Sequence, residues 1–238
     1  MFYPMGFYGN PMYIVVLIVG MVLSIGAQAL VQGAYAKWRK VPNTRGVTGA
    51  QAARYLLDSN GLQNVRIEPS QGGGLSDHYD PSQKVLRLSP DVYSNASVAS
   101  VAVAAHETGH ALQDQASYAP LRLRSAIVPV AGIGSQLGIW IMIGGILVGL
   151  QSLALVGLVL FAVTFLFTVI TLPVEFNAST RALNQIEKTS LLTSQEMSGA
   201  RSVLRAAALT YVAAAAASLL QVLYWGSIIL GGGGRRRG

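Results

Sequence analysis

The run His106-Glu107-Thr108-Gly109-His110 places two imidazoles and a carboxylate at a spacing suited to metal chemistry. Residues four apart lie on one face of an α-helix, so His106 and His110 can bind one Zn²⁺ through their ring nitrogens. Glu107 lies about 100° further round the helix axis, where its carboxylate can reach a water on the metal rather than the metal itself. Because zinc lowers the pKa of such a water and polarises a carbonyl, Glu107 would act as general base and then protonate the leaving amine of a cut peptide.

The alternative for this run is a pair of helix histidines that make ordinary hydrogen bonds. The chain contains only three histidines, and the pattern arises by chance in about one such chain in a thousand. The pattern therefore favours a zinc site.

A catalytic zinc site needs a third protein ligand and leaves a fourth position open. The chain has no cysteine and only one other histidine, so the candidates are His78 and the carboxylates. Glu175 is the best of these, because it directly follows an apolar run that ends at residue 172, and a carboxylate there is costly without a cation. The alternatives are that His78 is the ligand, or that Glu175 pairs with Arg181 or is simply solvated.

Two further residues are candidates for transition-state support. His78 and Tyr79 are expected in a turn before a predicted strand at 84–88, and either could donate a hydrogen bond to the developing oxyanion. The strand itself could bind an extended substrate along its edge. Plain loop residues and an edge without function are the alternatives.

Composition decides the class of protein. Of 238 residues, 52% are hydrophobic and 11% are charged, whereas soluble domains average about 25% charged residues. A plain soluble globule is therefore excluded, and the absence of cysteine excludes disulfide scaffolds, thiolate metal sites and a cysteine nucleophile. The net charge of +7 does not indicate nucleic-acid binding, because the cations flank apolar runs without interleaved aromatic residues.

Four apolar runs, at residues 12–31, 126–150, 152–172 and 209–230, are long enough to cross a membrane. The first could instead be a cleaved signal peptide, but no Lys or Arg precedes it and Lys37-Trp38-Arg39-Lys40 follows, which favours a retained anchor. Four spans place fourteen of the seventeen Lys and Arg residues on one face, the cytoplasmic one. The tail Arg235-Arg236-Arg237 is then on the wrong face, unless the fourth run does not fully cross.

The polar segment between the first two runs predicts a small α+β domain. Thr48 and Gln51 fit a capping box for a helix at 48–59, and a second helix at 97–115 carries the two histidines. Segments 64–68 and 84–88 alternate with the period of a strand and predict a small hairpin or edge strand pair.

The expected fold class is a mainly α integral membrane protein, with about four transmembrane helices and a small α+β zincin-like metalloprotease domain. The chain divides accordingly into an N-terminal transmembrane anchor (1–36), a cytoplasmic catalytic segment (37–124), a transmembrane hairpin (125–173), a cytoplasmic segment with the third zinc ligand (174–208), a transmembrane helix (209–231) and a flexible Gly/Arg tail (232–238).

Several motifs in order carry a resemblance to a family. They are Ser76-Asp77-His78-Tyr79-Asp80-Pro81, Leu86-Arg87-Leu88-Ser89, Ala104-Ala105-His106-Glu107-Thr108-Gly109-His110-Ala111 and Pro173-Val174-Glu175-Phe176-Asn177-Ala178-Ser179. Over nearly the whole chain, they resemble the YugP-type neutral zinc metallopeptidases of bacterial membranes. The resemblance implies that His106, His110 and Glu175 are the zinc ligands and that Glu107 is the catalytic base.

A more distant resemblance is to the HtpX-type membrane proteases, in which a Glu-aromatic-x-Ala-Asp motif supplies the third ligand. Here Ser179 stands in place of the aspartate. The carboxylate that would support a zinc ligand is therefore unassigned, with Asp114 as one candidate.

The sequence thus predicts a zinc endopeptidase of the bacterial inner membrane whose active site faces the cytoplasm and cuts membrane or misfolded proteins. The rival is a non-proteolytic membrane scaffold or adaptor that retains a zinc site, and Glu107 favours the enzyme because a structural site has no need of an unliganded carboxylate. A channel or transporter is disfavoured, since the four runs carry no ionisable residue at mid-span. Expected partners are a protein or peptide substrate, the lipid bilayer, and a membrane protein or a second copy of the chain, with no nucleic acid.

Overall fold

The computed structural model describes residues 11–72 and 76–231, so the Arg235-Arg236-Arg237 tail lies outside the described residues. The described chain is mainly helical, with one three-stranded sheet. Its contacts divide it into two compact units. The first contains residues up to Gly26, 123–172 and from Tyr211 onward, and the second contains residues 27–122 and 173–210.

Four helices of the described chain are long and apolar enough to cross a membrane: α1 (Pro11–Trp38), α5 (Ala119–Leu147), α6 (Gln151–Thr189) and α7 (Ser194–Gly231). Helices α1, α6 and α7 contain the predicted runs 12–31, 152–172 and 209–230, and α5 contains the run 126–150 as far as Leu147. Many large apolar side chains on these helices are exposed, among them Ile25, Trp140 and Val159, as expected for residues that face lipid. Each helix extends beyond its predicted run at one end or both, because polar residues continue the helical backbone, whereas α5 ends at Leu147, before the turn to α6.

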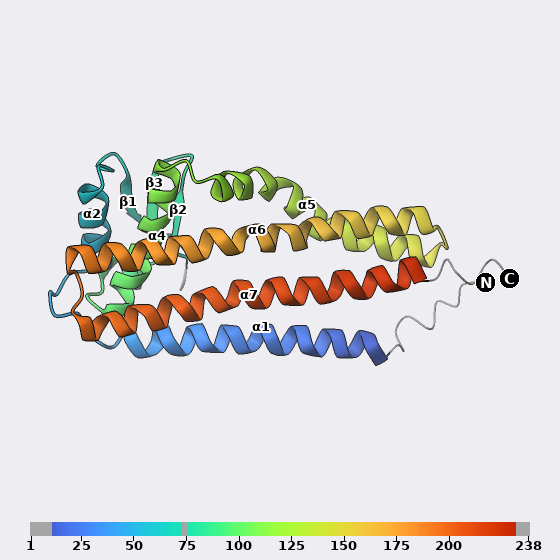
Figure 1. Ribbon diagram of the computed structural model, residues 1–238, viewed down its shortest axis with the longest axis horizontal. Coiled ribbons are helices and arrows are strands. Elements are labelled where there is room, and N and C mark those ends of the chain that lie inside the picture. Colours follow the sequence, from blue (N-terminus) through green and yellow to red (C-terminus); the bar gives the residue numbers. More distant parts are fainter. Residues whose placement is uncertain (1–10, 73–75, 232–238) are drawn as a thin grey trace. The chain divides into compact units, whose positions relative to one another are not determined.

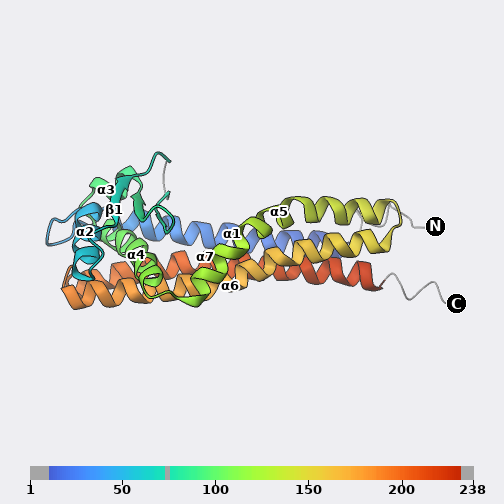
Figure 2. The same ribbon diagram turned by 90° about the horizontal axis from the view of Figure 1, so that it is seen from above.

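The first unit is held together by close helix packing. The tight turn between α5 and α6 contains Gly149 at a φ of +72°, a conformation that favours glycine. This turn joins two helices that approach each other closely. A Cβ at Gly138 of α5 would lie 2.8 Å from the Phe161 backbone nitrogen of α6, and a Cβ at Gly134 would lie 2.5 Å from the Leu160 carbonyl oxygen. Small residues thus allow α5 and α6 to pack backbone against backbone (Figure 2), as helices in membranes commonly do.

The second unit contains the sheet and the short helices. These are α2 (Gly49–Ser59), β1 (Arg66–Pro69), β2 (His78–Asp80), β3 (Val85–Leu88), α3 (Pro90–Ser94) and α4 (Val98–Gln115). The capping box predicted at α2 is confirmed, since the Thr48 hydroxyl accepts from the Gln51 backbone and the Gln51 side chain accepts from the Thr48 backbone. The helix predicted at 97–115 is confirmed as α4, with Ser97 as its N-cap.

The two predicted strands pair with each other, but in parallel and not as a hairpin. The sheet order is β1-β3-β2, with β1 parallel to β3 and β2 antiparallel to β3. The hairpin joins β2 to β3 through a turn in which Asp80 accepts hydrogen bonds from the backbone of Ser82 and Gln83. The sequence predicts a turn and not a strand at His78-Tyr79-Asp80, because three residues are too few to show the period of a strand.

The strand at 85–88 is therefore central and not an edge, which corrects the expectation that it could bind a substrate along its edge. Val85, Leu86 and Leu88 are fully buried, because both faces of β3 are covered. Helices α2, α3 and α4 gather around the sheet (Figure 2).

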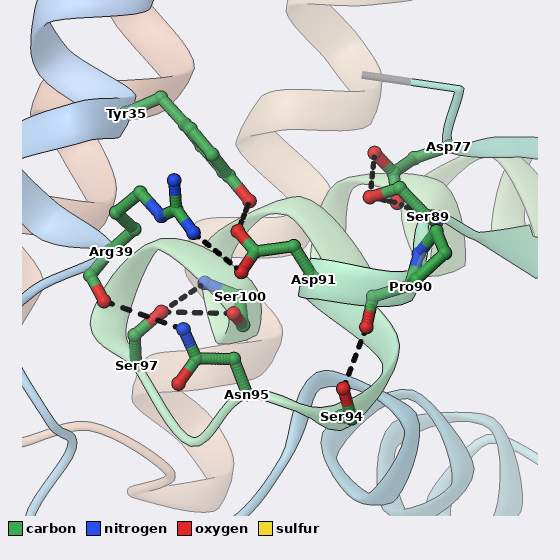
Figure 3. A network of polar contacts seen from close by, with 10 residues as sticks. All are labelled: Tyr35, Arg39, Asp77, Ser89, Pro90, Asp91, Ser94, Asn95, Ser97 and Ser100. Carbon is green, nitrogen blue, oxygen red and sulfur yellow. Dashed lines mark hydrogen bonds and ion pairs between the residues drawn. The ribbon is translucent and has the colours of Figure 1, made fainter. Parts of the chain in front are cut away.

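A polar network joins the end of α1 to α3 within the second unit (Figure 3). The Tyr35 hydroxyl donates to one oxygen of Asp91 at 2.6 Å, and the Arg39 guanidinium contacts the other at 2.8 Å. In the same view, Asp77 accepts from the backbone N–H and the hydroxyl of Ser89 at 2.7 and 3.1 Å. These contacts fix the segments that precede α4.

Candidate metal centre

Three side chains from α4 and α6 converge in the second unit. The Nε2 atoms of His106 and His110 lie 3.2 and 3.7 Å from the same oxygen, Glu175 Oε2. The potential ligand atoms of all three residues lie within 4.8 Å of one another. Two imidazoles and one carboxylate are a donor set that catalytic zinc takes in proteins, so these residues could hold a metal ion.

Helix α4 supplies two of these donors and helix α6 supplies the third. His106 and His110 are one turn apart on α4, and their ring centroids are 4.9 Å apart. Glu175 lies on α6, which passes through Pro173 without ending. The structure thus brings Glu175 to the two histidines, whereas the expected alternative partner, Arg181, donates instead to Asn177.

Two of these three side chains are buried. Glu175 is 2% exposed and His110 is 8% exposed. A buried carboxylate requires compensation by a cation or by hydrogen bonds. Burial alone would lower the pKa of His110, but its contact with Glu175 and the nearby charge of Glu107 outweigh this, so its pKa lies above the ordinary value. Negative charge therefore dominates the site and favours a bound cation.

The second nitrogen of each imidazole has its own partner. His106 Nδ1 lies 3.1 Å from the Ser179 hydroxyl, and His110 Nδ1 lies 3.0 Å from Gln113 Oε1. Gln113 is fully buried and donates to the Val174 carbonyl at 2.7 Å. Such contacts fix the orientation of each ring, so that both Nε2 atoms lie toward Glu175, where they could bind a metal.

Glu107 stands beside the group, and its carboxylate has no partner among the residues that the structure describes. It is 8% exposed, and no hydrogen bond or ion pair joins its carboxylate to another residue within 11–72 or 76–231. A buried carboxylate with free oxygens next to a possible metal position can take a proton from a water there.

The two candidates for oxyanion support lie on β2 and not in a turn. The Tyr79 hydroxyl donates to Asp114 at 2.7 Å, and His78 Nδ1 lies 2.9 Å from the Ser76 carbonyl oxygen. His78 is not a member of the group formed by His106, His110 and Glu175. Catalytic roles for His78 and Tyr79 therefore remain predictions.

Asp114 also contacts Lys84. Ser179 and Gln113, and not Asp114, contact the two imidazoles, and the sequence does not predict this role for either residue. Their spacing could have indicated them, because Ser179 is four residues after Glu175 and Gln113 is three after His110, distances that share a helix face.

Comparisons with known proteins agree with this chemistry. Residues 13–230 match the model of a family described as "Putative neutral zinc metallopeptidase". The chain is also 45% identical over 202 residues to "Putative membrane protease YugP" of Bacillus subtilis (strain 168), with 85% of this chain and 89% of the relative covered. No solved structure gives a significant match.

Proposed function

Because the chain belongs to this family of neutral zinc metallopeptidases and is a membrane protein, we propose that it is a zinc-dependent endopeptidase that cuts membrane or misfolded proteins. His106, His110 and Glu175 hold the zinc, and Glu107 is the general base. The observation that carries the proposal is the buried carboxylate of Glu107, which has no partner in the described chain and adjoins three convergent donors.

When bound, zinc supplies Lewis-acid activation of a water molecule and of the scissile carbonyl. Glu107 accepts the proton of the attacking water and delivers it to the nitrogen of the leaving amine. Ser179 and Gln113 hold the imidazoles of His106 and His110 in place, so that neither ring has to reorient during the reaction.

An extended substrate is expected to bind along β2. This strand pairs with β3 on one side and has no strand on its other side among the described residues. It also contacts α4, the helix that carries the two histidines. Addition of the substrate as a fourth strand would use the backbone of residues 78–80, with His78 and Tyr79 as candidates for oxyanion support.

The test compares purified wild type with Glu107→Gln in detergent, using an unfolded protein as substrate and measuring zinc on the same samples. Both proteins should hold about one zinc, and cleavage by the variant should be at least about 100-fold slower, since general bases contribute about that much. Glu187→Gln, at an exposed carboxylate on the surface of α6, is the matched control and should cleave as wild type does. Zinc in both proteins with cleavage in neither would favour a scaffold, and equal cleavage by both would exclude Glu107 as the base.

We also propose that the chain crosses the membrane several times with the zinc site facing the cytoplasm. The natural chain has no cysteine, so single-cysteine variants report accessibility without background. Lys188→Cys should resist a membrane-impermeant maleimide in intact spheroplasts, and Val148→Cys in the α5–α6 turn should react. The reverse pattern would contradict this orientation.

A further inference from the structure

A groove of about 770 Å³ lies between α1 and α7 in the second unit. The two helices run side by side there (Figure 1). The residues that line the groove come from one face of each helix, among them Leu30, Gly33 and Lys37 of α1 and Arg201, Arg205 and Leu209 of α7. None of them belongs to the group around His106.

The charge of the groove has one sign. Lys37, Arg201 and Arg205 line it, and its lining contains no acidic residue. No carboxylate within the described ranges, 11–72 and 76–231, forms an ion pair with these three cations. The ammonium of Lys37 lies 5.1 Å from the ring centroid of Trp38, a contact that leaves its charge uncompensated. Three uncompensated cations around one groove favour an anionic occupant.

The lining also changes from polar to apolar along the helices. Arg201 and Arg205 are four residues apart and share a face of α7 with Leu209, where the predicted apolar run begins. On α1, Leu30 lies at the end of the first apolar run, and Lys37 lies about two turns beyond it. One end of the groove therefore suits a charged group, and the other suits hydrocarbon.

Small residues keep the groove open. A Cβ added at Gly33 would meet no atom of the described residues within 4 Å, so none of them fills the space beside it. Ala29, Ala34, Ser198 and Ala206 also present short side chains to the groove.

We propose that this groove binds an anionic phospholipid, with its phosphate between Lys37, Arg201 and Arg205 and its acyl chains beside Leu30 and Leu209. Arginine pairs with phosphate oxygens through two parallel N–H donors, and basic pockets between transmembrane helices suit lipid headgroups. A free phosphate would use the three cations but would leave the apolar end of the groove without an occupant. The amphipathic lining therefore selects a lipid.

The experiment uses the purified full chain, stripped of lipid in an uncharged detergent, and measures binding of phosphatidylglycerol and phosphatidylcholine with identical acyl chains by native mass spectrometry. Wild type should bind phosphatidylglycerol about 10- to 100-fold more tightly than phosphatidylcholine. The triple variant Lys37→Gln, Arg201→Gln, Arg205→Gln should lose this preference. Retention of the preference by that variant would overturn the proposal.

The matched control is Lys40→Gln, Arg45→Gln, Lys188→Gln, which removes the same charge at exposed cations that do not line the groove. It should keep the wild-type preference, and equal loss in both triple variants would mean that only net charge acts. Gly33→Phe keeps every cation and fills the groove, so it should also weaken phosphatidylglycerol binding about tenfold or more. Full competition by glycerol 3-phosphate would assign the groove to a free anion instead.

Zinc content and thermal unfolding of each variant are measured on the same samples. Wild-type zinc content with a lost lipid preference would show that the fold is intact. Lipid binding and cleavage are separate readouts, so failure of one proposal does not imply failure of the other.

Discussion

A Cβ at Gly109 would lie 2.5 Å from the carbonyl oxygen of Ala178. The two residues belong to α4 and α6, and each is within three positions of a proposed zinc ligand, His110 or Glu175. Because nothing larger than a hydrogen fits at Gly109, the backbones of the two helices meet there. This contact sets the distance between α4 and α6. At that distance His106 and His110 of α4 both lie near one oxygen of Glu175 on α6.

Gly109→Ala is therefore expected to push α4 and α6 apart. Overpacking of this kind costs about 1–3 kcal/mol, and the displacement should lower zinc affinity as well. The measurement is zinc content and thermal unfolding in detergent. Gly132→Ala is the control, since a Cβ there meets no atom of the described residues within 4 Å. Equal behaviour of the two variants would contradict the proposed contact.

Ser179→Ala should weaken zinc binding about 10- to 100-fold, because loss of a group that orients a metal-bound imidazole has an effect of that size. Its hydroxyl is 3.1 Å from His106 Nδ1. The measurement is competition for zinc against a chelator of known affinity. Thr180→Ala is the control, because within the described chain the Thr180 hydroxyl bonds only to its own helix, at the Phe176 carbonyl. Unchanged affinity in Ser179→Ala would remove the supporting role of Ser179.

The chain's local chemistry predicted the helices well, and the three residues predicted as zinc ligands lie together in the structure. The capping box at Thr48 and the spacing of His106 and His110 involve residues within one turn, so the sequence alone contains the information. The order and direction of the strands in the sheet could not be predicted in this way. Pairing of β1 with β3 is parallel and joins residues about twenty positions apart, and the period of a strand does not reveal its partner.

For a related reason, the sequence did not predict that Ser179 and Gln113 contact the imidazoles. Ser179 differs from the aspartate of the more distant resemblance, and only the approach of α6 to α4 shows that a hydroxyl at this position reaches His106. Likewise, Gln113 acquires its role from the Val174 carbonyl on another helix. Contacts between helices depend on packing, which the spacing within one helix does not specify.

Glu196→Gln should destabilise the start of α7. The carboxylate accepts hydrogen bonds from the Thr193 backbone at 2.7 Å and from the backbone and hydroxyl of Thr44 at 2.6 and 2.7 Å. Loss of the charge from such bonds costs about 1–2 kcal/mol, which corresponds to about 2–8 °C in the midpoint of thermal unfolding. Glu187→Gln, an exposed carboxylate on α6, should leave the midpoint unchanged. Equal midpoints for both variants would show that the Glu196 contacts do not stabilise the fold.

The stability of Asp77→Asn relative to wild type should increase as the pH rises. Burial raises the pKa of Asp77, the hydrogen bonds from Ser89 partly offset this, and the charge of Glu107 adds to it. As the pH rises, this carboxyl loses its proton in the unfolded chain before it does in the folded chain. The free energy of unfolding therefore falls as the pH rises from 3.8, the ordinary pKa, through the higher pKa of the folded state. Unfolding midpoints of both proteins across that range test this, and a constant difference would contradict it.

Glu175→Ala tests the central claim most directly, because the account assigns one zinc to His106, His110 and Glu175. Metal-free protein is reconstituted with zinc, dialysed and analysed for metal, with Glu187→Ala as the control. Wild type and the control should retain one zinc per chain, whereas Glu175→Ala should bind zinc at least about 100-fold more weakly and fail to cleave. Full zinc retention with normal cleavage by Glu175→Ala, or no zinc in wild type, would contradict the account.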